Sequence, residues 1–362
     1  MKERKKKNLI YLVITLSILS MSLIIMYTNG VFNHEEEKSI KPENLSSQAV
    51  KKVSYGKLPT TLHLLYSHPF EKKSKIITID QSKKIKQKYT FENPGLDLLS
   101  WTNTKEIGVY SSHTKGLYLM SEKLKKKQFI SYDSPVSFYN QSSSESIVGL
   151  NTSIEKNTLI IKTPEKSKEL TFKPLITNMI KNQKYVFVFS DIIEEERSVV
   201  HIVDIKKGEL IKEIEVPYHH TSDMAIYDNN LVLSTEGKLT VISLKSFDVN
   251  SFMISNREVG LDQLMVNEDK LYVSYFDNGK TGIARLNKSF ETEKNQLFDF
   301  PLMKSRFTKD HLYVLTQISS KKDEIGYGAV ASFDLKAFKQ VGQFMIPKLD
   351  YKVQDFLVDG GY

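Results

Sequence analysis

The residues with the clearest chemical potential in this sequence are aspartates at the start of short apolar segments. Four segments carry an aspartate there: Asp97, Asp223, Asp262 and Asp355. The corresponding positions of the other segments are Ser or Thr, for example Thr177 and Ser305. If the segments are equivalent strands of a repeated fold, the four carboxylates converge and repel one another unless a cation or basic ligand neutralises them. The favoured interpretation is nevertheless local, because an Asp at the start of an inner strand accepts hydrogen bonds from nearby backbone N–H groups. The alternative is a site for a divalent cation or a cationic ligand.

Two histidines precede one of these aspartates. His219 and His220 lie shortly before Asp223, and two imidazoles with a carboxylate could bind zinc or another transition metal. Adjacent side chains of an extended segment point to opposite sides, so at most His220 would face the same site. The alternative is a solvent-facing loop in which Tyr218 is a contact residue. We therefore place His220 and Tyr218 with the four aspartates as candidate ligand-binding residues, and assign no metal ligand and no catalytic residue.

Motifs of common enzyme classes are absent from the sequence. It contains no Gly-x-Ser-x-Gly elbow, no His-Glu-x-x-His, no phosphate-binding glycine loop and no dinucleotide fingerprint. It contains no cysteine either, which excludes disulfides, thiolate catalysis and Cys-ligated metal. Asp277-Asn278-Gly279-Lys280 predicts a hairpin turn, since Asn-Gly readily adopts positive φ. The Glu that a calcium loop needs downstream is missing there.

The elements that must position these residues are short strands. From about Leu58 onward, apolar runs alternate with Asn, Asp, Gly, Lys and Ser, which is typical of an all-β protein. The runs recur about every 40 residues, and a repeat of that length with four short strands indicates a propeller blade. The clearest copies begin at Leu231, Leu271 and Leu312. About seven such blades fit the span 57–362.

The first repeat, near Leu62, lacks an obvious innermost strand, and the C-terminal segment Val353–Val358 offers one. We expect these two to pair, because ring closure removes an open sheet edge.

The repeat unit carries a family resemblance. Leu-Tyr-Val, then apolar-x-apolar-Asp-Leu-Lys, then apolar-x-x-Pro resembles the YVTN/WD40-like seven-bladed propellers of exported, membrane-anchored bacterial proteins. This sequence lacks the Gly-His and Trp-Asp dipeptides of true WD40 blades, so their hydrogen-bonded tetrad is not expected. The resemblance implies architecture and carries no catalytic residues.

The N-terminus predicts a membrane anchor. A basic tip at 1–8 precedes an uncharged run, Leu9–Tyr27, that would span about 28 Å as a helix, close to the hydrocarbon thickness of a bilayer. The basic tip should stay in the cytoplasm, which places the rest of this single-pass protein outside the cell membrane. Residues 28–56 read as a flexible tether. The alternative is a cleaved signal peptide, although its apolar region is usually shorter.

These features favour a binding function. The leading hypothesis is a membrane-anchored, extracytoplasmic binding or scaffold module for a protein, peptide or cell-envelope ligand, without a cofactor. The alternative is a metal-assisted hydrolase, lactonase or lyase at the central channel, so whether the protein is an enzyme stays open; a sensory or accessory subunit of an envelope complex is a third possibility. Lys and Arg number 51 against 43 Asp and Glu, and this scattered excess does not indicate a nucleic-acid partner.

Overall fold

The computed structural model describes residues 60–361 with short gaps at 69–72, 94, 103–105, 112–113, 122, 126, 143, 153–155, 193–194, 217–220, 236, 256–258, 321–322, 348 and 350. At 101, 127, 318–320 and 323–327 it describes the backbone alone. In these residues no helix is long and apolar enough to cross a membrane. The anchor and tether predicted within 1–56 lie outside them.

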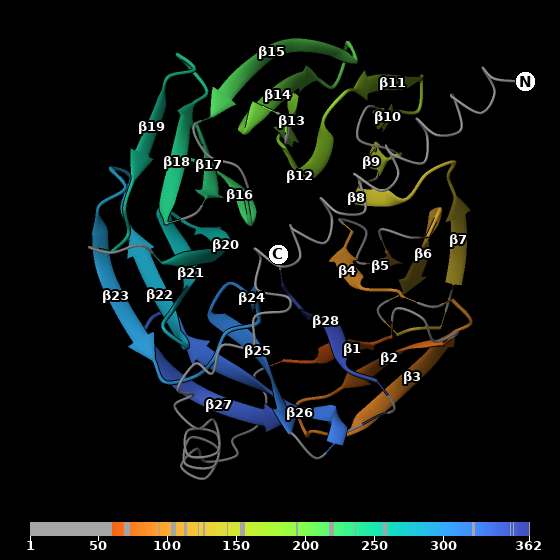
Figure 1. The fold of residues 1–362 in the computed structure, drawn as a ribbon, viewed down its shortest axis with the longest axis vertical. Helices are drawn as coiled ribbons and strands as arrows, with labels where there is room; N and C mark the ends of the chain where they lie inside the picture. The colour runs from red at the N-terminus through yellow and green to blue at the C-terminus, as the bar shows by residue number, and fades with distance from the viewer. Residues whose placement is uncertain are drawn as a thin grey trace, which may run out of the picture. The chain divides into compact units, whose positions relative to one another are not determined.

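The described strands form seven antiparallel sheets of four strands each (Figure 1). The first three sheets, innermost strand first, are β28 (Val353–Val358), β1 (Leu62–Tyr66), β2 (Ser74–Ile79) and β3 (Ile85–Phe91); β4 (Leu98–Trp101), β5 (Glu106–Tyr110), β6 (Gly116–Ser121) and β7 (Lys127–Ser131); and β8 (Val136–Gln141), β9 (Ser146–Asn151), β10 (Asn157–Lys162) and β11 (Ser167–Phe172).

The other four sheets repeat the same strand order. They are β12 (Leu175–Lys181), β13 (Tyr185–Ile192), β14 (Arg197–Asp204) and β15 (Glu209–Val216); β16 (Asp223–Tyr227), β17 (Asn230–Thr235), β18 (Lys238–Ser243) and β19 (Val249–Phe252); β20 (Gly260–Asn267), β21 (Lys270–Asp277), β22 (Lys280–Leu286) and β23 (Thr292–Phe298); and β24 (Lys304–Phe307), β25 (His311–Ser320), β26 (Asp323–Asp334) and β27 (Lys339–Met345).

Burial within a blade follows the position of the strand. The second strands are sandwiched between two neighbouring blades and are largely buried, as in β1, where all five residues, including His63, are buried. The fourth strands form the outer rim and face water, as in β15, where six of eight residues are exposed. A four-stranded sheet with both faces apolar cannot stand alone, so the blades must stack on one another.

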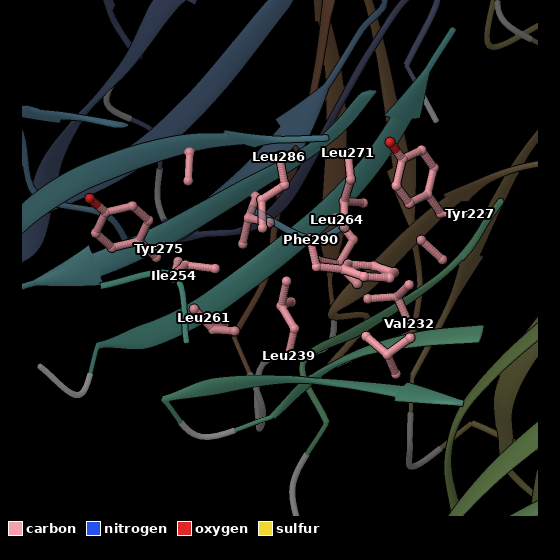
Figure 2. Packing of buried hydrophobic residues seen from close by; sticks show 14 of the residues in the cluster. Tyr227, Val232, Leu239, Ile254, Leu261, Leu264, Leu271, Tyr275, Leu286 and Phe290 are labelled. Atoms are coloured by element: carbon pink, nitrogen blue, oxygen red, sulfur yellow. The ribbon is translucent and has the colours of Figure 1, made fainter. Parts of the chain in front are cut away.

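Seven clusters of buried hydrophobic side chains, each between two neighbouring sheets, supply this stacking. Figure 2 shows the cluster between β16–β19 and β20–β23, where Val232 and Leu239 of one blade meet Leu271 and Leu286 of the next. Another cluster joins the last blade to the first, with Tyr313 packed among residues of β1 and β28. The fold is therefore a closed, all-β, seven-bladed propeller, as the sequence predicted.

The ring closes through the C-terminal strand. β28 pairs antiparallel with β1, with Leu62 opposite Val358 and Leu65 opposite Asp355, so residues from both ends of the propeller share its first sheet. This is the pairing expected from the missing innermost strand of the first repeat. The turn at Asn278-Gly279 also forms as expected, with φ of 47° and 78° and with Asp277 paired to Lys280.

Candidate functional site at the mouth of the central channel

The innermost strands of the seven blades surround a central channel (Figure 1). We use the name Asp mouth for the end of this channel at which these strands begin, beside Asp97, Asp223, Asp262 and Asp355. An innermost strand has one edge paired with its own blade, and its other edge leaves backbone groups turned toward the channel. Such an edge needs other hydrogen-bond partners, and the aspartates of the mouth provide several of them.

Asp355 joins three blades. Its side chain is fully buried, and its Oδ2 accepts a hydrogen bond from the backbone N–H of Leu99 in the next blade at 2.9 Å. Its Oδ1 accepts from the backbone N–H of Phe356 and from Nη2 of Arg306, both at 2.8 Å, and lies 3.0 Å from Nζ of Lys304. Two cations of the last blade therefore compensate a buried carboxylate of the first.

Asp223 bridges two blades without such a cation. Its Oδ1 accepts from the N–H of Met224 at 2.8 Å, and its Oδ2 accepts from the N–H of Leu264 in the next blade at 2.9 Å. Burial raises the pKa of Asp223 to about 7 against the opposing effect of these two N–H donors. The carboxyl group is therefore held in place by backbone groups while its charge stays poorly compensated.

Asp262 repeats the bridge with a shift of one residue. It accepts a hydrogen bond from the hydroxyl of Ser305 in the next blade, and burial raises its pKa. The structural counterpart of Asp223 in this blade is Gln263, because the N–H of each bonds a Ser hydroxyl of the second strand, Ser234 or Ser274. A bulge between Leu261 and Leu264 accounts for the shift.

The other expected positions differ in detail. Asp97 lies just before β4, where its N–H bonds the carbonyl of Tyr110 at 3.3 Å. In β12 the expected position was Thr177, whose hydroxyl bonds the carbonyl of Phe189 within the same blade. Its neighbour Asn178 takes the Asp-like role, since its Oδ1 accepts from the N–H of Met179 at 2.8 Å.

Two basic residues of the mouth, Lys304 and Arg306, were not among the residues predicted from the sequence. Arg306 is 12% exposed and donates to the carbonyls of Phe356 and Ser305, at 3.2 and 3.1 Å, in addition to Asp355. Lys304 and Arg306 are two positions apart on β24 and reach the same carboxylate oxygen. Two basic residues in alternate positions at the start of a predicted innermost strand could have indicated, from the sequence, that both side chains lie at the mouth.

The structure brings Asp223, Asp262 and Asp355 to one mouth with Lys304 and Arg306 among them. In the part of the chain that the structure describes, no group of three or more His, Cys, Asp or Glu residues could hold a metal ion. His220 and Tyr218 lie outside the described residues.

A cavity of about 370 Å³ opens beside these groups. It is lined by β12, β16, β20 and β24, with Asp223, Gln263 and Lys181 as its polar side chains. The surface that lines it is polar and apolar in nearly equal parts, which suits a ligand that carries both kinds of group.

Comparison with known proteins supports the architecture. No family model matches the chain. The chain is similar to "Uncharacterized protein YeeG" of Bacillus subtilis (strain 168), with 23% identity over 305 residues that cover 82% of this chain and 86% of that protein. Among solved structures it resembles the Dos1 propeller, with a TM-score of 0.53 and 12% identity over 69% of this chain and 73% of that chain. The propeller fold is shared.

A second similar structure is that of an enzyme. Dihydro-heme d1 dehydrogenase NirN in complex with DHE matches with a TM-score of 0.52 and 12% identity, over 78% of this chain and 66% of that chain. The chain thus spans just under two thirds of NirN. At such identities the likeness shows the fold alone. The finer resemblance to exported YVTN/WD40-like proteins stays a prediction.

Proposed function

We propose that this protein is a non-enzymatic binding module, anchored in the cell membrane by its N-terminal segment, whose propeller lies outside the membrane. It recognises a protein, a peptide or a polymer of the cell envelope across the face that surrounds the Asp mouth. The carboxylates that could have served catalysis support this reading, because they are engaged in holding neighbouring blades together.

The observation that carries the proposal is a set of exposed apolar side chains on that face. Met253, Phe276 and Met303 are 48%, 41% and 55% exposed. Met253 follows the end of β19, Phe276 lies at the end of β21, and Met303 precedes β24. In an antiparallel blade the start of the first strand and the ends of the second and fourth strands share one edge, which is the edge at the Asp mouth.

The longest hairpin of the described chain rises over the same face. β25 and β26 continue past Lys304, the first residue of β24, which pairs with Leu315. Their pairing extends to Ser320 and Asp323, well beyond the start of the innermost strand. A projecting hairpin beside exposed apolar side chains suits contact with a large ligand.

The alternative, a metal-assisted hydrolase, lactonase or lyase, is favoured by one observation. A carboxyl group such as Asp223, with its pKa raised to about 7, suits general acid–base chemistry near neutral pH. Its two backbone donors, however, give it the strand-bridging role that Asp355 also has.

The test uses cross-linking on intact cells that make the full-length chain, with an amine-reactive reagent that does not cross membranes. One variant changes the face, Met253→Ser with Phe276→Ser and Met303→Ser. The matched control changes exposed apolar residues of the outer rim, Ile85→Ser with Phe129→Ser and Ile211→Ser, which are 49%, 45% and 44% exposed.

We expect a cross-linked partner that the rim variant retains and the face variant loses at least tenfold. Equal loss or equal retention in the two variants contradicts recognition through this face. The absence of any cross-link to this chain contradicts the location outside the membrane, since the chain is rich in lysine.

A further inference from the structure

We propose that the cavity in the central channel is a binding site for a primary ammonium group carried on a short apolar body, with Asp223 as the counter-ion. This site is distinct from the exposed face assigned above, and it concerns a small ligand or a single side chain. The proposal stands on the walls of the cavity and on the distribution of charge around the mouth.

The cavity has Asp223 and Gln263 at the Asp mouth, and further in it is lined mainly by apolar side chains, with Lys181 at the end of β12. Asp223 and Gln263 lie where β16 and β20 leave the Asp mouth, and Ile226 and Val266 follow three residues further along the same strands. Ile180 of β12 lines the cavity as well, and these three apolar side chains are half-buried. Three residues of extended strand span about 10 Å. The cavity therefore matches a ligand with a polar head and an apolar body of about that length.

The charge missing from the mouth is positive. Lys304 and Arg306 both contact Asp355, and Lys181 pairs with Glu145. In the described part of the chain, the hydrogen bonds to Asp223 come from backbone N–H groups and no Lys or Arg forms an ion pair with it. Four buried or half-buried carboxylates, Asp97, Asp223, Asp262 and Asp355, thus lie at a mouth whose two cations both contact Asp355. A bound ammonium would supply a counter-ion for Asp223.

An ammonium fits this site better than a metal ion. A calcium ion takes six to eight oxygen ligands, whereas Asp223 and Gln263 are the residues of the cavity wall that offer side-chain oxygens. The apolar side chains that line the cavity favour a ligand that buries hydrocarbon on binding.

Binding should depend on pH with a defined sign. Burial raises the pKa of Asp223 to about 7, with Asp262 of β20 raising it further and Arg306 of β24 lowering it. Lys181 of β12 also lines the cavity, and His219 and His220 precede Asp223 outside the described residues. Because the ammonium binds the ionised carboxylate, its affinity should rise about tenfold between pH 6 and pH 8.

The experiment is a calorimetric titration of the full-length chain with three probes of one size: n-pentylammonium, 1-pentanol and pentanoate. We expect n-pentylammonium to bind at least tenfold more tightly than 1-pentanol at pH 8, and pentanoate to bind no better than the alcohol. Methylammonium should bind more weakly than n-pentylammonium, because it does not reach the apolar side chains that line the cavity. Asp223→Asn should lose at least tenfold in affinity for n-pentylammonium and should lose the pH dependence.

The face variant with Met253, Phe276 and Met303 changed to serine should bind n-pentylammonium as the unaltered chain does, which separates this proposal from the proposed function. The three-probe comparison on the unaltered chain stays decisive if Asp223→Asn does not fold. Equal affinity for the amine and the alcohol at pH 8, or undiminished amine binding by folded Asp223→Asn, overturns the proposal.

Discussion

At the scale of single residues, aspartate side chains at the Asp mouth accept hydrogen bonds from backbone N–H groups that the sheets leave unpaired. The innermost strands leave N–H groups facing the channel, and Asp355 and Asp223 each accept one from the neighbouring blade. Burying a carboxylate costs several kcal/mol unless charge and hydrogen bonds compensate it. Asp355 is compensated by Arg306 and Lys304, and this explains how a fully buried charge persists at the junction of three blades.

Replacing Asp355 by asparagine should destabilise the propeller strongly. The isosteric amide leaves Arg306 and Lys304 without their counter-ion and removes an acceptor for one of the backbone N–H groups. We expect a loss of about 3 kcal/mol in the free energy of unfolding, as when one partner of a buried pair is removed. Chemical denaturation of the full-length chain measures this loss.

The control is Asp299→Asn, because the side chain of Asp299 is 62% exposed and its replacement should leave the free energy of unfolding unchanged. Equal losses in the two variants would refute the role of Asp355.

Some of this site was predictable and some was not. The repeat placed aspartates at the start of innermost strands, which was enough to predict their convergence on one mouth. The bulge that moves Asp262 out of step with Asp223 has no signature in the sequence, because it depends on the pairing of β20 with β21. Arg306 was overlooked because its partner Asp355 lies 49 positions away in the chain, and a charge pair across blades appears only once the ring is closed.

At the scale of elements, the C-terminal strand decides whether the ring has an edge. β28 completes the first sheet, fills the cluster between the last and first blades with Val353 and Phe356, and delivers Asp355 to the mouth. This closure could be predicted from the sequence, because the first repeat lacks an innermost strand and the C-terminal segment forms one strand that belongs to no other repeat. The Asn278-Gly279 turn was legible for a local reason, since its two positive φ angles suit these residue types.

Removal of residues 353–362 should open the propeller. The exposed edge of β1 and the uncovered apolar cluster should abolish a single cooperative melting transition and promote self-association. Size-exclusion chromatography and thermal melting of the truncated chain measure both effects.

A synthetic peptide of residues 349–362 should restore the transition. The same peptide with Asp355→Asn should restore it less, and a scrambled peptide should not restore it. A truncated chain that melts like the intact protein would show that β28 does not carry closure.

At the scale of the whole molecule, the propeller is held by seven similar interfaces and by hydrogen bonds between blades at the Asp mouth. Repetition made the architecture predictable, since one pattern read seven times outweighs errors in any single strand. Function was less predictable because the repeat encodes packing, and likeness to solved structures at 12% identity shows the fold alone. The membrane anchor stays a prediction from the apolar run at 9–27.

The central claim is that protein groups, rather than a bound metal ion, hold the Asp mouth together. The most direct test is thermal melting of the full-length chain with a chelator, with millimolar calcium and with micromolar zinc, beside a metal analysis of the same sample. We predict the same midpoint in all conditions and no stoichiometric metal. A metal present at 100 times its dissociation constant would add about 2.7 kcal/mol. A rise of roughly 5 °C or more, lost in Asp223→Asn or Asp355→Asn, would contradict the claim.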